Sequence, residues 1–293
     1  MMNITKKILK KIIYSLHLRP PSYPYISGDT FRKITKKRYE KQKKINLSEI
    51  RKGDIVFVES PLVIEFYEKI VKNLKHPIIL IITNGDENFD ESYSFIFDHP
   101  MIYYAFVQNI IFNHKKVQAI PIGLENLKYL ENGIILDFLN YRIKSIKKKC
   151  KVLVNFSINT NIYERKAAYD IFSNLDFSFC FLEKKETSVY RKIASNYKYI
   201  LSPPGNGFDC HRTWETILLG SIPIVKKNPF FNYFPNLPIL PLEKWEDIYK
   251  YTIKDLNNYY HCNYNNIINC PYLFFRYWKI QILKKRRQVF YGR

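Results

Sequence analysis

The stretch Leu201–Val225 reads "LSPPGNGFDCHRTWETILLGSIPIV" and places a polar turn and a helix between two apolar segments. The first segment has the short, apolar composition of a buried strand. Two prolines then fix the direction of the chain, and Gly205 and Gly207 allow backbone conformations or close approaches that a side chain would forbid. We expect the helix to begin after an N-cap at Asp209 and to stop at Gly220. A strand, a glycine turn, a helix and a second strand in this order indicate one unit of a parallel α/β sheet.

The glycine turn leads into a helix N-terminus, where free amide donors and the positive end of the helix dipole favour an anion. Arg212, in the first turn, adds a forked donor that suits a diphosphate. Glu215 lies one turn beyond His211 and Arg212, so the three share one side of the helix, while Trp214 and its apolar neighbours face the core. Each residue also has a plainer interpretation, as a turn former, a helix ion pair or a cap. Together they predict a site for a phosphorylated ligand.

The run 202–225 resembles the C-terminal signature of exostosin-like glycosyltransferases, in which a G-N-G-x-D-x-H-R-x-W-E block precedes an apolar helix, a glycine and a proline-containing strand. The resemblance implies the GT-B fold, in which two Rossmann-like parallel-sheet halves face each other across a cleft. It implies that Glu215 bonds the ribose hydroxyls of a sugar nucleotide, and that Arg212 and the amides of Gly205 to Gly207 hold its diphosphate. The side chains that it places at the sugar end are Asn206, Asp209 and His211.

A second stretch, Asn155–Tyr169 ("NFSINTNIYERKAAY"), is similar to the first loop and helix of many GT-B donor domains. That similarity makes Arg165 a second phosphate ligand. No Asp-x-Asp metal motif occurs in the sequence, so we expect a metal-independent, inverting hexosyl- or pentosyltransferase without a cofactor. The chain lacks the transmembrane anchor of eukaryotic exostosin proteins, which favours a bacterial or viral surface-glycan enzyme with a glycan or lipid-linked acceptor.

Apolar runs and helical patterns alternate along the rest of the chain, as expected for β-α-β units. We expect two successive α/β halves, an acceptor-side domain over 1–149 and a nucleotide-sugar-binding domain over 150–270, followed by a C-terminal helix over 271–293. In open parallel sheets ligands lie beyond the carboxyl ends of the strands. The polar loops at strand ends are therefore the informative positions.

Inverting transfer requires a base that takes the proton of the acceptor hydroxyl. The candidates are carboxylates at the expected strand ends of the first half. Asp86, in "TNGDEN", is the first choice and Asp29, in "SGDTF", is the second. Both are also common turn and cap residues. The remaining candidates are Glu59, Glu87, Glu125 and His211.

Two further function classes stay open. The formal charge of +21 over 293 residues makes polyanions plausible partners, although a lysine-rich composition is also expected from an AT-rich genome. Aromatic and basic residues interleave in 272–291, as in some nucleic-acid-binding proteins, but no nucleic-acid-binding motif occurs and we expect no such partner. The other alternative is a non-catalytic relative that only binds a glycan.

The N-terminal segment Ile4–Arg19, "ITKKILKKIIYSLHLR", places apolar residues along one helical side with five Lys and Arg around it. This pattern predicts a basic helix on an anionic membrane surface, or an ordinary helix packed on the protein. No run approaches the ~18 apolar residues of a membrane span. Five cysteines without a C-x-x-C pair favour a reducing compartment, so we expect a cytoplasmic enzyme peripheral to the membrane.

Overall fold

The computed structural model describes residues 2–142, 147–183 and 185–291, and the chain divides into two compact units. Unit 1 comprises Met1–Leu130 and Phe274–Arg293, and unit 2 comprises Glu131–Leu273. Unit 2 is thus an insertion within the chain of unit 1. The sequence predicts a division at 149/150 and a separate C-terminal helix over 271–293. The position differs because the helix that follows residue 131 packs within unit 2, and because the C-terminal helix packs on the sheet of unit 1.

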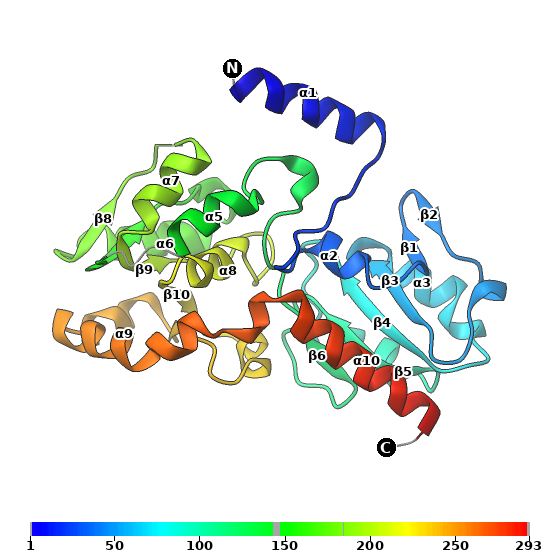
Figure 1. Cartoon of the computed structure of the whole chain (residues 1–293). Coiled ribbons are helices and arrows are strands. Elements are labelled where there is room, and N and C mark those ends of the chain that lie inside the picture. The colour runs from blue at the N-terminus through cyan, green and yellow to red at the C-terminus, as the bar shows by residue number, and fades with distance from the viewer. Residues whose placement is uncertain (1, 143–146, 184, 292–293) are drawn as a thin grey trace. The chain divides into compact units, whose positions relative to one another are not determined.

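The sheet of unit 1 has six strands in the order β2-β1-β3-β4-β5-β6 (Figure 1). Strands β1 and β2 form an antiparallel pair, and every other neighbouring pair is parallel. All six residues of β4 are buried, as expected for a parallel strand that is covered on both faces. The strands are β1 (Arg38–Glu40), β2 (Lys43–Lys44), β3 (Ile55–Glu59), β4 (Ile78–Thr83), β5 (Ile102–Val107) and β6 (Val117–Ala119).

Helices α2, α3, α4 and α10 of unit 1 contact strands of this sheet, and the C-terminal helix α10 packs against β4 and β5. Its side chains Trp278 and Ile282 are fully buried, and Arg286 Nε donates to the carbonyl of Gly53 at 3.1 Å. The helices are α1 (Met2–Ser15), α2 (Gly28–Arg32), α3 (Val63–Lys69), α4 (Ser94–Asp98) and α10 (Phe275–Tyr291). Short 3₁₀ turns lie at Leu47–Glu49, Ser60–Leu62, Val71–Asn73, Glu91–Tyr93 and Leu127–Tyr129. Within the part of the chain that the structure describes, no helix is long and apolar enough to span a bilayer.

The sheet of unit 2 has five strands in the order β11-β10-β9-β7-β8, and all of its pairs are parallel. The strands are β7 (Lys149–Val154), β8 (Ser178–Cys180), β9 (Tyr197–Leu201), β10 (Ile222–Lys226) and β11 (Leu240–Leu242). The helices are α5 (Ile135–Arg142), α6 (Ile162–Phe172), α7 (Thr187–Ala194), α8 (His211–Leu218) and α9 (Ile253–Ile268). Short 3₁₀ turns lie at Ile158–Thr160, Pro229–Tyr233, Trp245–Lys250 and Pro271–Leu273.

The predicted α/β architecture with two parallel-sheet halves is confirmed. The β1–β2 hairpin was not foreseen, because it lies in a lysine-rich segment without apolar alternation. The sequence over 129–151 also carries a helical pattern; α5 covers Ile135–Arg142 of it, and β7 already begins at Lys149. Residues 143–146 of that prediction lie outside the described residues.

Candidate functional sites

The loop between β9 and α8 lies at the carboxyl edge of the sheet of unit 2, as the sequence predicted. Gly205 donates its amide to the Gly207 carbonyl at 3.1 Å, and Asn161 Nδ2 donates to the Gly205 carbonyl at 3.0 Å. Asn161 also caps α6, since its side chain accepts from the amide of Glu164. The glycine turn is therefore fastened to the N-terminus of α6 at the end of the neighbouring strand β7.

Arg165 braces the same loop from α6. Its Nε donates to the Pro204 carbonyl at 2.9 Å and its Nη1 to the Ser157 carbonyl at 2.8 Å. A Cβ on Gly205 would lie 3.0 Å from Nη2 of Arg165. Neither glycine of the turn has a positive φ, so glycine is needed at 205 for this close approach and not for its backbone conformation.

Two guanidinium groups lie close together at this loop. Burial lowers the pKa of Arg165, and the charge of the neighbouring Arg212 lowers it further, although Cys210 acts in the opposite direction. Arg212 Nη1 donates to the hydroxyl of Tyr190, with the guanidinium 5.3 Å from the ring centroid. Among the described residues, neither arginine forms an ion pair with a carboxylate. An anion placed here would relieve the repulsion between them.

The N-terminus of α8 differs from the prediction in its cap. The N-cap is Cys210, with φ −122° and ψ 141°, and its side chain makes no capping hydrogen bond. The prediction that Asp209 is the N-cap is wrong, because Asp209 Oδ1 instead accepts from Nε1 of Trp214 at 2.7 Å. His211 is half-buried at the first helical position, and Asn206 is exposed in the turn. The side chain at the N-cap position therefore does not cap α8.

Glu215 presents an open acceptor on the next turn of α8. Its Oε1 is buried and has no hydrogen-bond partner, and the nearest cation is Nη2 of Arg191 at 3.9 Å. Arg191 is fully buried, pairs with Asp137 at 2.9 Å and lies over the ring of Phe138 at 3.9 Å from its centroid. A buried carboxylate oxygen without a donor costs free energy, which a ligand hydroxyl would recover.

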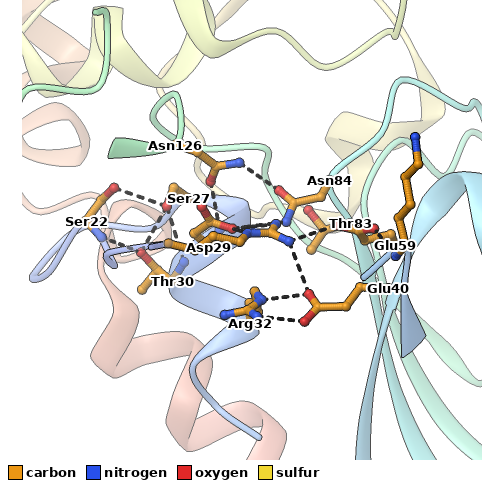
Figure 2. A network of polar contacts seen from close by, with 12 residues as sticks. Ser22, Ser27, Asp29, Thr30, Arg32, Glu40, Glu59, Thr83, Asn84 and Asn126 are labelled. Atoms are coloured by element: carbon orange, nitrogen blue, oxygen red, sulfur yellow. Dashed lines mark hydrogen bonds and ion pairs between the residues drawn. The ribbon is translucent and has the colours of Figure 1, made fainter. Parts of the chain in front are cut away.

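The carboxyl edge of the sheet of unit 1 holds a network of charged side chains (Figure 2). Arg19 Nε donates to Asp29 Oδ1 at 2.6 Å, and its Nη1 contacts Glu59 Oε1 at 2.8 Å and Glu40 Oε2 at 3.1 Å. Arg32 forms a bidentate pair with Glu40, at 2.7 and 2.6 Å. Glu40 and Glu59 are the last residues of β1 and β3, so the sheet itself brings the carboxylates together.

The pKa values of two members of the network reflect their environment. Burial alone would lower the pKa of Arg19, but the charges and hydrogen bonds of Asp29 and Glu59 raise it above its ordinary value. Burial alone would raise the pKa of Glu40, but its hydrogen bonds to Arg32 and the surrounding guanidinium charges lower it. Both groups are therefore held in their charged forms.

The two first choices for the catalytic base occupy different environments. Asp29 is fully buried in the first turn of α2, receives a 3.4 Å contact from Asn84 Nδ2, and has a second oxygen without a partner. Asn126 accepts from the amide of Asp29 at 2.7 Å and donates to Asn84 at 2.9 Å. Asp86 is exposed in the loop that follows β4. Their catalytic roles remain predictions.

The other candidate carboxylates lie on the same side of unit 1. Glu59 belongs to the Arg19 network, Glu87 has a buried Oε2 without a partner, and Glu125 is half-buried in the loop before Asn126. A pocket of about 240 Å³ adjoins the network, and its walls include Ile13, Leu18, Arg19, Lys41, Glu59 and Lys128. Nowhere in the described ranges do three or more His, Cys, Asp or Glu side chains gather as a metal site would require.

The sequence did not predict a role for three residues at these sites, Arg19, Arg191 and Asn126. Arg19 sits beyond a basic helix, where it reads as one more surface charge, and Arg191 lies in the amphipathic pattern of α7 as an ordinary polar position. Asn126 directly follows Glu125, and an amide side chain in a loop carries no charge or periodic pattern that would mark it as part of a site. The apolar alternation marks which edge of a sheet to inspect, but the pairing of distant charges leaves no periodic signal.

Comparison with known proteins adds little to this geometry. No protein-family profile and no curated protein matches the chain. Two solved structures are similar in part: the α,α-trehalose-6-phosphate synthase from Burkholderia multivorans, with a TM-score of 0.44 and 9% identity over 84% of this chain and 72% of that one, and the T4 phage β-glucosyltransferase, with a TM-score of 0.32 and 13% identity over 83% and 82%. These similarities are too weak to assign an activity to this chain.

Proposed function

We propose that this protein is a GT-B glycosyltransferase that moves a hexosyl or pentosyl group from a nucleotide-diphosphate sugar to a hydroxyl of a glycan or lipid-linked acceptor. The observation that carries the proposal is the pair Arg165 and Arg212 at the N-terminus of α8, since neither arginine has a carboxylate partner among the described residues. Helix amides and arginine forks together form a strong site for a diphosphate.

The open Oε1 of Glu215 supports the second part of the donor. A carboxylate oxygen accepts hydrogen bonds only, and vicinal ribose hydroxyls are suitable donors. Nη2 of Arg191 lies 3.9 Å from Oε1 of Glu215, which is too long for a hydrogen bond, so this oxygen remains available as an acceptor. Arg191 is thus a positioning residue for Glu215 in this proposal.

The proposed chemistry is inverting and metal-independent. Departure of the nucleoside diphosphate places negative charge beside Arg165, Arg212 and the first amides of α8, which stabilise it in place of a metal ion. A carboxylate of unit 1, Asp86 first and Asp29 second, takes the proton of the acceptor hydroxyl. The sugar carbon then bonds to the acceptor oxygen as its bond to the diphosphate breaks.

Calorimetric titration with a panel of nucleoside diphosphates tests the donor site. We expect Arg212→Ala and Glu215→Ala to weaken the preferred nucleotide by about 10- to 100-fold each, the loss expected for a charge-assisted hydrogen bond. The matched controls are Lys254→Ala and Asp170→Ala, which remove charges of the same sign from the surface of α9 and α6. Wild-type affinity in both site variants would rule out the proposed site.

A further inference from the structure

Helix α1 carries large apolar side chains that unit 1 leaves uncovered. Among the residues of α1 whose burial the structure describes, only Ile13 is buried, at 7% exposure, and α1 contacts the 127–129 segment. Leu16 continues the helical path past Ser15, since its amide bonds to the Ile12 carbonyl at 3.0 Å. The exposed apolar residues are Ile8, Leu9, Ile12 and Leu16, each between 45% and 62% accessible.

These side chains form one continuous stripe. At about 100° per residue, Ile8, Ile12, Leu16, Leu9 and Ile13 span an arc of about 140° around the helix. The lysines at 10 and 11 fall outside this arc at the same helical spacing. The first 28 residues of the chain include no Asp or Glu, so the segment itself carries a net positive charge.

The helix is also tied to the body of unit 1 at its far end. Arg19, four residues after Ser15, is locked between Asp29, Glu40 and Glu59. With Ile13 and Arg19 both engaged, the helix keeps its buried border toward unit 1, and the stripe from Ile8 to Leu16 remains outward.

We propose that α1 docks the protein on an anionic lipid bilayer, with the Ile8–Leu16 stripe inserted among the acyl chains and the lysines among the headgroups. A wide apolar stripe opposite clustered lysines is the arrangement that an anionic membrane surface selects. A second copy of this chain fits the stripe less well, because pairing two helices brings like charges together in a protein of formal charge +21.

Docking would set the candidate acceptor side of unit 1 at the lipid surface. The pocket beside α1 is lined by Ile13 and Leu18 from the N-terminal segment and by Arg19, Glu59, Lys41 and Lys128 from the body. An acceptor with a lipid anchor and a phosphate-linked head could place its head there. The docking is independent of sugar transfer, whereas this purpose rests on the proposed function.

Vesicle co-sedimentation tests the docking. The full chain is mixed with vesicles of phosphatidylcholine alone or with one-third phosphatidylglycerol, and we expect binding only to the anionic vesicles, with loss at high salt. The variant I8S/I12S/L16S should lower the partition coefficient by about 100-fold or more. The matched control is L136S/I253S/I280S, which removes three equally exposed apolar side chains from other helices and should bind as the wild type does.

Three results would overturn the docking: no sedimentation of the wild type with anionic vesicles, equal binding to neutral vesicles, or unchanged binding of I8S/I12S/L16S. A fourth is a change in oligomeric state caused by I8S/I12S/L16S without lipid, which would assign the stripe to a second copy. Nucleoside diphosphate affinity is measured in parallel by calorimetry. If the wild type binds no nucleoside diphosphate, the proposed function is contradicted. Vesicle binding tests the docking of α1 separately from this result.

Discussion

The arginines at the carboxyl edges of the two sheets differ in their partners, which are carboxylates in unit 1 and neutral groups in unit 2. In unit 1, Arg19 forms ion pairs with three carboxylates. Arg32 forms a bidentate pair with one of them, that of Glu40. In unit 2, Arg165 bonds to backbone carbonyls and Arg212 to a tyrosine hydroxyl. The arginines of the first edge are paired with carboxylates, whereas those of the second edge have no carboxylate partner among the described residues.

This difference separates two uses of the same residue type. A buried cation that is paired with carboxylates contributes to the stability of the fold, because removing it leaves those carboxylates buried and unpaired. A cation that is held in place by neutral groups keeps its electrostatic field, because carbonyls and hydroxyls orient it without neutralising it. The contrast predicts which arginine substitutions affect folding and which affect binding.

The largest effect should come from the base. We expect Asp86→Asn to lower turnover by about 10²- to 10⁴-fold and to leave nucleotide affinity unchanged, measured as nucleoside diphosphate release in the presence of acceptor. Asp29→Asn is the variant for comparison, since Asp29 is the second candidate base and lies in the network around Arg19. Loss of turnover only in Asp29→Asn would move the base into that network, and normal turnover in both would exclude either residue.

The next effect separates Arg19 from Arg212. Arg19→Met removes the cation shared by Asp29 and Glu59, and we expect the free energy of unfolding to fall by about 3–5 kcal/mol. Arg212→Met removes no carboxylate partner and should change it by less than about 1 kcal/mol. Urea unfolding of the two variants and of the wild type measures the free energy of unfolding. Equal decreases in both variants would contradict the proposed difference between the two edges.

A pH experiment tests the same idea on Lys148, a lysine of unit 2 whose hydrogen-bond partners among the described residues are all neutral groups. Its Nζ donates to the carbonyls of Ser195 and Leu219, at the C-terminal ends of α7 and α8, and to Oγ of Ser221. Burial lowers the pKa of Lys148 from 10.5 to about 8. Between these values the unfolded chain binds more protons, so the contribution of this residue to stability rises with pH.

We therefore expect the stability of the wild type relative to Lys148→Met to increase by about 1–3 kcal/mol from pH 8 to pH 10.5. Unfolding midpoints of both proteins across this range provide the measurement, and the difference between them removes the titration of other groups. A difference that stays constant with pH would mean that Lys148 titrates normally.

The smallest effect concerns the close approach at the turn. In Gly205→Ala the new methyl group would lie 3.0 Å from Nη2 of Arg165, so the guanidinium must shift by a few tenths of an ångström. We expect nucleotide affinity to fall by about 2- to 10-fold with little loss of stability. Gly220→Ala is the reverse control: its φ of +79° makes alanine cost about 1 kcal/mol of stability, and affinity should be kept.

Local patterns in the sequence predicted the α8 segment closely. Trp214, Ile217 and Leu218 are buried as their helical spacing indicates, and Gly220 ends the helix with a positive φ. The cap was misplaced by one residue, because Asp209 is recruited by the Trp214 indole, a contact that depends on how two side chains fold back on each other. Local propensity gives no access to such a contact.

The network of unit 1 shows the other limit of the sequence. Its members Arg19, Asp29, Glu40 and Glu59 come from a linker, a short helix and two strands, and only the parallel order of β1 and β3 brings them together. Asp29 and Glu59 were singled out as strand-end carboxylates, but their shared cation was not. Charges that meet through sheet topology have no fixed spacing along the chain.

The insertion of unit 2 also sets an order of assembly during synthesis. Every residue of unit 2 precedes residue 274, so the ribosome delivers unit 2 whole while unit 1 still lacks α10. Until then β4 and β5 have no Trp278 or Ile282 to cover them, and the carbonyl of Gly53 has no Arg286. Because domains generally fold as units, unit 2 can reach its final packing first. The unit that holds the N-terminus is the last to be completed.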